Sequence, residues 1–279
     1  MMLTELLGHL IRAGSLPFTG QIKEMAIVIN NRRLFLTLAL SFSLATTTLA
    51  DGGPVKIACV GDSITFGAGV ENREVNAYPQ VLDRLLGDRA RVVNFGRSGA
   101  TLLKEGDFPY WEREQFTQAT EFQPDIVIIK LGTNDSKPQN WKLSEQFPAD
   151  LEAMIAHFRS LESTPIVYLC KPVPVPKTAY GISEAIVGGE VIPHVEAVAR
   201  KMKCRLIDLY TPLSKMPENI PDGVHPNAAG AKVMAETVYD AITRGNGKLR
   251  SRNWARTGAL AKNLLDNMPV HVGKAEVAS

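Results

Sequence analysis

The chain has 279 residues, enough for one large domain or two small ones, and its 45% hydrophobic and 22% charged residues are ordinary globular usage. That composition excludes a disordered chain and a bundle of membrane helices for the bulk of the protein. The 31 basic and 29 acidic residues leave a formal net charge of only +2, which excludes the strongly basic surface of a nucleic-acid binder.

An export signal is predicted near the amino terminus. Arg32 and Arg33 precede an apolar run at residues 34–44, and small residues up to Ala50 follow where a signal peptidase would cut. The run is shorter than the ~20 apolar residues of a membrane-spanning helix, so we expect cleavage after Ala50 and no stable membrane insertion afterwards. Because such signals begin close to the initiating methionine, translation is hypothesised to begin at Met25. The expected product is periplasmic or extracellular.

Five β-rich runs alternate with helical stretches from Val55 onward, the pattern of βαβ units in a parallel sheet. Most of these runs are continuously apolar, as expected when helices cover both faces of the sheet. A three-layer αβα sandwich with a five-stranded parallel sheet is therefore predicted for a domain of residues 51–244. The predicted strands are 55–60, 91–94, 125–131, 165–170 and 204–209.

Two helices are predicted from the spacing of apolar residues and from capping signals. The second begins near Asn227, a good N-cap, and ends near Gly245. The basic segment 245–279 that follows is interpreted as an appendage, either a solvated tail or a docking helix. The first helix packs against the third or fourth strand with a stripe at helical spacing, namely Phe147, Leu151, Met154, Ile155 and Phe158.

Four loops at the carboxyl ends of predicted strands carry the chemistry. That edge of an open parallel sheet is where ligands bind. Acyl transfer needs a nucleophilic hydroxyl, an imidazole base, an acid that orients the base, and donors for the oxyanion. The loops supply all four, since they contain Ser63, Gly96 and Gly99, Asn134, and Asp222 with His225.

Ser63 is the predicted nucleophile and His225 the predicted base. The other histidines lie outside the predicted domain or on and near helices, where surface or packing roles are expected. Asp222 precedes His225 by three residues, so a tight loop can bring its carboxylate to the imidazole, unless the pair merely caps the next helix. The predicted oxyanion donors are the backbone N–H groups of Ser63 and Gly99 and the side-chain amide of Asn134.

Over about residues 55–242, these four blocks resemble those of the SGNH hydrolases, also called the GDSL esterase/lipase family. The resemblance implies a flavodoxin-like αβα sandwich and no metal or other cofactor. Gly99 is preferred to Gly96 because the family's glycine usually follows the strand-end asparagine, here Asn94, by five residues. The implied catalytic serine, glycine, asparagine, aspartate and histidine are Ser63, Gly99, Asn134, Asp222 and His225.

The segments 70–74, 94–103 and 222–227 are similar to bacterial enzymes described as sialate or other carbohydrate O-acetylesterases. This similarity implies a short acyl ester, acetyl above all, on a sugar such as sialic acid, and it leaves the oligomeric state open. Aromatic residues near the site are candidates for a sugar-stacking wall, with core or surface packing as the alternative. They are Tyr110, Trp111 and Trp141.

Several rival functions remain. A lysophospholipase or thioesterase of the same family fits the same blocks, as does a catalytically silent glycan-binding protein. Gly67 and Gly69 suggest a nucleotide or flavin site, but Asn72 stands in place of the third glycine and no phosphate-loop lysine follows. Asp222 and His225 suggest a metal hydrolase, but no further histidine ligands cluster with them.

Overall fold

The protein is described from a computed structural model, which defines residues 53–244 and Leu249. The predicted export signal, the proposed start at Met25 and nearly all of the segment 245–279 lie outside the described residues. Within the described part of the chain, no helix combines the length and the apolar character needed to cross a membrane.

One five-stranded sheet forms the centre of the fold, and all its neighbouring strands are parallel. The strand order is β2-β1-β3-β4-β5, so the predicted fold is confirmed, and every predicted strand lies within two residues of its observed bounds. The strands are β1 (Val55–Gly61), β2 (Ala90–Gly96), β3 (Ile126–Lys130), β4 (Ile166–Lys171) and β5 (Arg205–Asp208).

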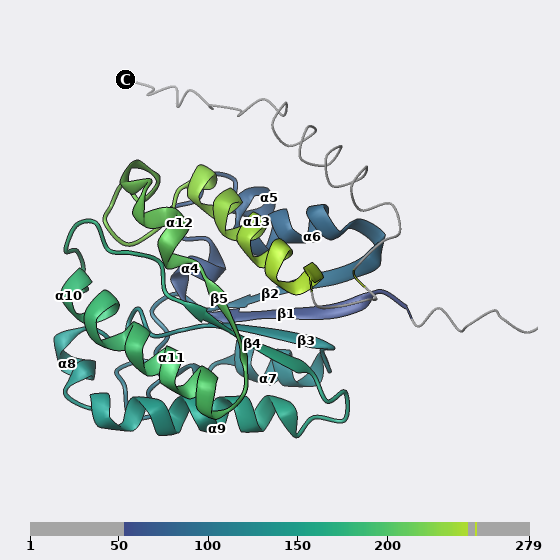
Figure 1. Cartoon of the computed structure of the whole chain (residues 1–279), viewed down its shortest axis with the longest axis horizontal. Coiled ribbons are helices and arrows are strands. Elements are labelled where there is room, and N and C mark those ends of the chain that lie inside the picture. Colours follow the sequence, from purple (N-terminus) through teal and green to yellow (C-terminus); the bar gives the residue numbers. More distant parts are fainter. Residues whose placement is uncertain (1–52, 245–248, 250–279) are drawn as a thin grey trace, which may run out of the picture. The chain divides into compact units, whose positions relative to one another are not determined.

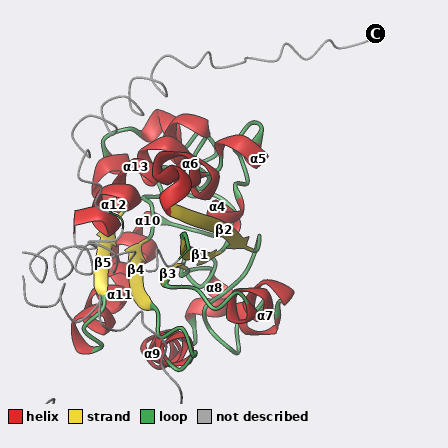
Figure 2. Cartoon of the chain, turned by 90° about the vertical axis from the view of Figure 1, so that its right-hand side faces the viewer, coloured by secondary structure: helices red, strands yellow, loops and turns green. Residues whose placement is uncertain are grey.

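Helices cover both faces of the sheet and complete three layers (Figures 1 and 2). The helices α6 and α13 lie on one face, and α7, α9 and α11 lie on the other. The helices are α4 (Ser63–Phe66), α5 (Arg73–Asn76), α6 (Tyr78–Leu86), α7 (Glu114–Glu121), α8 (Pro138–Trp141), α9 (Phe147–Arg159), α10 (Glu184–Ile186), α11 (Ile192–Lys201), α12 (Tyr210–Ser214) and α13 (Ala228–Arg244).

The core is divided into two main layers by the sheet. Along β1, Ile57 and Cys59 pack under α6 and α13, while Ala58 and Val60 pack against the opposite helices. All four side chains are fully buried, which explains why residues 57–60 form a continuous apolar run.

Both predicted helices are present. The five apolar residues of the predicted stripe are buried on α9, which contacts β4. The last helix begins at Ala228, and the Asn227 side chain caps it by accepting a hydrogen bond from the Gly230 N–H at 3.0 Å. This cap fixes the entry of α13 directly after the loop that contains Asp222 and His225.

Candidate active site

Ser63 is the first residue of α4, directly after β1. Asp62 caps this short helix, because its Oδ1 atom accepts a hydrogen bond from the Ile64 N–H at 3.0 Å. The side chain of Ser63 is largely buried, with the residue only 7% exposed. The strand-to-helix turn therefore holds the hydroxyl at the carboxyl edge of the sheet. The order β2-β1-β3 shows that the sheet grows outward from β1 in both directions, and in open α/β sheets ligands bind at the carboxyl edge beside such a switch point.

A tight loop before α13 holds Asp222 and His225 in contact. The Asp222 carboxylate accepts hydrogen bonds from the Val224 N–H at 2.9 Å and the His225 N–H at 2.7 Å, and its Oδ2 lies 2.6 Å from His225 Nδ1. Burial raises the pKa of the Asp222 carboxyl, but these hydrogen bonds outweigh burial and hold the pKa below its ordinary value. Asp222 is therefore a carboxylate at neutral pH, and the proton of this contact lies on His225 Nδ1.

The structure brings Ser63 and His225 together across 162 positions of sequence. Ser63 Oγ lies 2.9 Å from His225 Nε2. Since Nδ1 carries the ring proton toward Asp222, Nε2 is free to accept the proton of the serine hydroxyl. The His225 side chain is 17% exposed and the Asp222 side chain 34% exposed, so the hydrogen-bonded chain borders solvent at its Asp222 end. Such a chain can pass a proton from serine to imidazole.

The two glycines of the second loop serve different purposes. A Cβ at Gly96 would collide with the backbone nitrogen of Phe66, so Gly96 permits close packing of β2 on α4. Gly99 has a φ of +83° and nothing nearer to an added Cβ than a Phe108 ring atom at 3.7 Å. The requirement for glycine at this position is therefore conformational, and Gly99 lies in the loop that follows β2.

Asn134 follows β3, and its side chain points into the protein, with the residue 4% exposed. Its Nδ2 donates a hydrogen bond to the Ala100 carbonyl at 3.1 Å, next to Gly99. This hydrogen bond uses one of the two amide protons and joins the second and third loops. Its backbone carbonyl in turn accepts a hydrogen bond from the Asn140 amide at 2.9 Å.

A buried ion pair lies beside the nucleophile, and the sequence analysis missed it. Lys130 Nζ lies 3.1 and 3.0 Å from the two carboxylate oxygens of Asp62 and 2.7 Å from the Thr133 hydroxyl. Both charged side chains are fully buried. Burial lowers the pKa of Lys130, and the Asp62 carboxylate opposes that shift. A lysine at the end of an otherwise apolar strand was the signal that a buried acidic partner exists.

A second missed residue, Asp135, joins two of the loops. Its fully buried carboxylate accepts hydrogen bonds from the Leu103 N–H at 2.8 Å and the Leu102 N–H at 3.1 Å. Burial raises the pKa of Asp135 to about 7 even though these two donors lower it. The carboxylate fixes the loop that carries Gly99 relative to the loop that carries Asn134.

Two of the predicted aromatic wall residues pack in the core. Tyr110 is fully buried and donates a hydrogen bond to the Phe95 carbonyl at 2.6 Å, so the structure contradicts a sugar-stacking role for it. Trp141 is 8% exposed and donates to Glu190 at 2.7 Å. Trp111 is half-buried, with its indole N–H directed to the Leu102 carbonyl. Packing, the alternative considered from the sequence, accounts for Tyr110 and Trp141.

An aromatic residue that the sequence analysis did not single out lies at the site. Tyr180 is 64% exposed, and its ring centroid lies 5.7 Å from that of His225. Its hydroxyl makes a long hydrogen bond of 3.4 Å to Asp222 Oδ2. No motif surrounds Tyr180, and only the folded loop brings it to the histidine.

Metal ligation was the other use considered for Asp222 and His225. Within residues 53–244, no group of three or more His, Cys, Asp and Glu side chains is arranged to hold a metal ion.

An acetylxylan esterase from Xylanibacter ruminicola is 39% identical over 206 residues, which cover 67% of this chain and 43% of that protein. The chain thus spans less than half the length of this curated relative.

Two solved structures share the fold at low sequence identity. A carbohydrate acetylesterase family member from Sinorhizobium meliloti has a TM-score of 0.55 at 20% identity, covering 68% of this chain and 98% of that one. A catalytic mutant of an acetylxylan esterase from Geobacillus stearothermophilus has a TM-score of 0.54 at 22% identity, covering 72% and 99%. The profile of the GDSL-like lipase/acylhydrolase family matches residues 59–233, so the chain belongs to this family.

Proposed function

We propose that the protein is a serine esterase that removes acetyl groups from an acetylated carbohydrate. The observation that carries the proposal is the hydrogen-bonded chain from Ser63 through His225 to Asp222. The acetylxylan and carbohydrate acetylesterases named among the similar proteins favour a xylan-type substrate. Acetylated sialic acid, the sugar suggested by the sequence, is the second substrate to test.

In the proposed reaction, Ser63 Oγ attacks the ester carbonyl carbon while its proton moves to His225 Nε2. Asp222 stabilises the imidazolium that forms, and it also holds the ring in orientation. The N–H groups of Ser63 and Gly99 and the amide of Asn134 bind the oxyanion, each contributing about 3 kcal/mol where the geometry is right. His225 then protonates the leaving sugar oxygen. Water attacks the acetyl-serine with His225 as base, which releases acetate and restores the hydroxyl.

The test compares three variants on p-nitrophenyl acetate and on acetylated xylan. We expect Ser63→Ala and His225→Ala each to lower kcat by roughly 10⁴-fold or more, and Asp222→Asn to cost less than His225→Ala. Ser214→Ala is the matched control, because this exposed hydroxyl on α12 bonds only to the Thr211 carbonyl. Near-normal hydrolysis by Ser63→Ala, with the circular dichroism unchanged, would reject the proposal.

Rival functions predict different results in the same assays. A lysophospholipase or thioesterase would favour long acyl chains or thioesters over acetyl esters. A silent glycan-binding protein would bind acetylated xylan without releasing acetate. A metal hydrolase would lose activity in a chelator, whereas the proposed mechanism is insensitive to it.

We also propose that the protein is exported by its amino-terminal segment, because a polymeric glycan is met outside the cytoplasm. Amino-terminal sequencing of the mature protein from the producing cell is expected to begin at Asp51. A protein that retains the preceding segment would reject this proposal.

A further inference from the structure

We infer that Tyr180 is a stacking platform for the sugar ring that carries the acetyl group. The inference rests on the proposed carbohydrate esterase function and names one of its binding contacts. Within residues 53–244, Tyr180 is the only aromatic residue whose side chain is exposed. An exposed aromatic ring beside a candidate catalytic histidine is a binding surface available to a ligand.

The position of the sugar during the reaction follows from the chemistry. His225 Nε2 takes the proton from Ser63 and must deliver it to the leaving oxygen, which therefore lies about 3 Å from Nε2. In an acetylated sugar, that oxygen is bonded directly to the sugar ring or to its exocyclic carbon. The ring must then lie within a few ångströms of the imidazole. The Tyr180 ring, with its centroid 5.7 Å from that of His225 and tilted by 60°, borders the same space.

The local backbone does not account for a tyrosine at this position. Ala179 and Ile182 exchange two backbone hydrogen bonds, at 3.1 and 2.8 Å, around a two-residue turn. Tyr180 and Gly181 have φ values of +55° and +76°, so both central residues are left-handed. Such a turn favours Asn-Gly, and a bulky side chain at its first central position is disfavoured. Tyr180 is also not a core residue, so neither turn geometry nor burial explains it.

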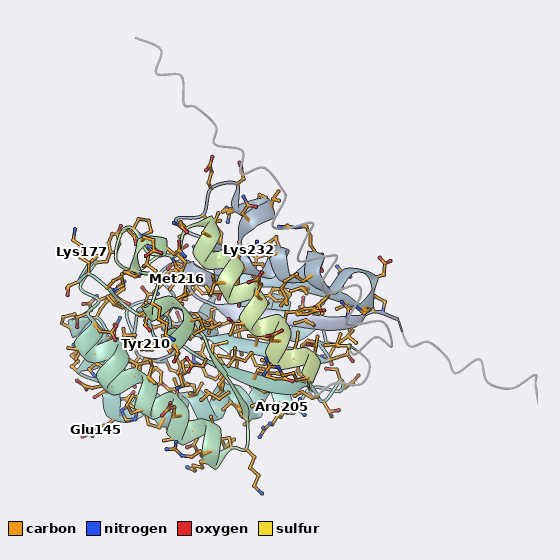
Figure 3. The ribbon with its side chains drawn as sticks, turned by 45° about the horizontal axis from the view of Figure 1, so that its top comes forward. Glu145, Lys177, Arg205, Tyr210, Met216 and Lys232 are labelled. Carbon is orange, nitrogen blue, oxygen red and sulfur yellow. The ribbon has the colours of Figure 1, made fainter. Side chains whose placement is uncertain are left out.

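The turn is held firmly against the loop of Asp222 and His225. Ile182, Val175 and Val224 are buried together in a small apolar cluster that joins the two loops. Gly223 has a φ of +91°, and a Cβ there would collide with the Lys177 carbonyl oxygen, so the backbones are in direct contact. The side chain of Lys177, which lies on the segment before the Tyr180 turn, points outward into solvent (Figure 3). The Tyr180 ring is thus placed by packing at the rim of the site.

A flat, amphipathic ring matches a pyranose. The equatorial hydroxyls of a xylopyranose leave axial C–H bonds on both faces, and these form an apolar surface that can lie on an aromatic ring. The tyrosine hydroxyl makes its long hydrogen bond to Asp222 Oδ2 at the edge of the ring, and the residue is 64% exposed, so ring surface is available to a sugar.

The test uses three variants with two substrates, acetylated xylo-oligosaccharides and p-nitrophenyl acetate, which has no sugar. Tyr180→Asn removes the ring and places a residue that favours this turn, so we expect its Tm to be equal to or higher than that of the wild type. We expect it to raise KM for the oligosaccharide about fivefold to tenfold. On p-nitrophenyl acetate, Tyr180→Asn should lower kcat/KM no more than Tyr180→Phe does, because both variants lose the contact of the hydroxyl with Asp222.

The matched controls separate the ring from its hydroxyl. Tyr180→Phe keeps the ring and loses the bond to Asp222, and Tyr180→Trp offers a larger ring, so both should keep KM for the oligosaccharide within about twofold of wild type. A loss in Tyr180→Phe equal to that in Tyr180→Asn would overturn the inference, as would an equal loss on both substrates. The wild type alone tests the proposed function, which fails if the wild type releases p-nitrophenol but releases no acetate from any acetylated sugar. That result would also reject Tyr180 as a stacking platform.

Discussion

Replacing Lys130 by Met tests the buried pair that supports the nucleophile. The change deletes the contacts of Nζ with both Asp62 oxygens and with Thr133, and it leaves a fully buried carboxylate with the Ile64 N–H as its remaining donor. Removing one partner of a buried ion pair costs about 3–5 kcal/mol. Because domains have only about 5–15 kcal/mol of stability, the variant is expected to fold but to be much weakened. Since Asp62 also caps the helix of Ser63, kcat should fall as well.

The assay is urea unfolding monitored by circular dichroism. It compares the wild type, Lys130→Met and the double variant Lys130→Met/Asp62→Asn. With an m-value of about 2 kcal/mol/M, the single change should lower the midpoint by about 1.5–2.5 M. Asn still accepts the capping hydrogen bond, and the double variant buries no charge, so we expect it to regain about 2 kcal/mol or more. A single variant weakened by less than about 1 kcal/mol, or a double variant less stable than the single one, would refute this reasoning.

Three further predictions concern the loops and the substrate. Gly223→Ala should lower esterase activity at least about tenfold, because residue 223 has a positive φ and the added Cβ would collide with the Lys177 carbonyl. Gly189 has open space around it, so Gly189→Ala should match the wild type in the same kinetic assay. The folded pKa of Asp135, raised to about 7 by burial, lies above its unfolded value of about 3.9, so the free energy of unfolding should fall as pH rises from about 4 to about 7. Denaturant titrations at several pH values in that range should show that the free energy of unfolding depends less on pH in Asp135→Asn than in the wild type. An unchanged dependence on pH would contradict the raised pKa of Asp135. Acetyl esters should be hydrolysed much faster than octanoyl esters when p-nitrophenyl substrates are compared, and a preference for long chains would favour the lipase function instead.

The layers and the sheet edge could be predicted because their signals are local. Most strands are largely apolar runs, and the loops of Ser63 and Asn134 directly follow strand ends, so the pattern of the chain places both residues at the same edge of the sheet. The proximity of His225 to Asp222 also follows from a spacing of three residues. These inferences need only the pattern of the chain and the rule that parallel strands align their carboxyl ends.

The remaining features depend on contacts between distant residues. Lys130 and Asp62 are 68 positions apart, and their pairing becomes visible only once β1 and β3 are neighbours. The exposure of an aromatic ring is likewise set by tertiary packing. Tyr110 lies near the site in sequence but is buried, whereas Tyr180 is carried to His225 by a turn that has no catalytic motif.

Covalent trapping tests the central claim most directly. An organophosphonate that mimics the tetrahedral intermediate should label the protein once, and mass spectrometry of its peptides should place the adduct on Ser63. Labelling should be abolished in Ser63→Ala and slowed at least about 10³-fold in His225→Ala, since the imidazole takes the hydroxyl proton. An adduct on another residue, or labelling of His225→Ala at the wild-type rate, would contradict a serine nucleophile activated by His225.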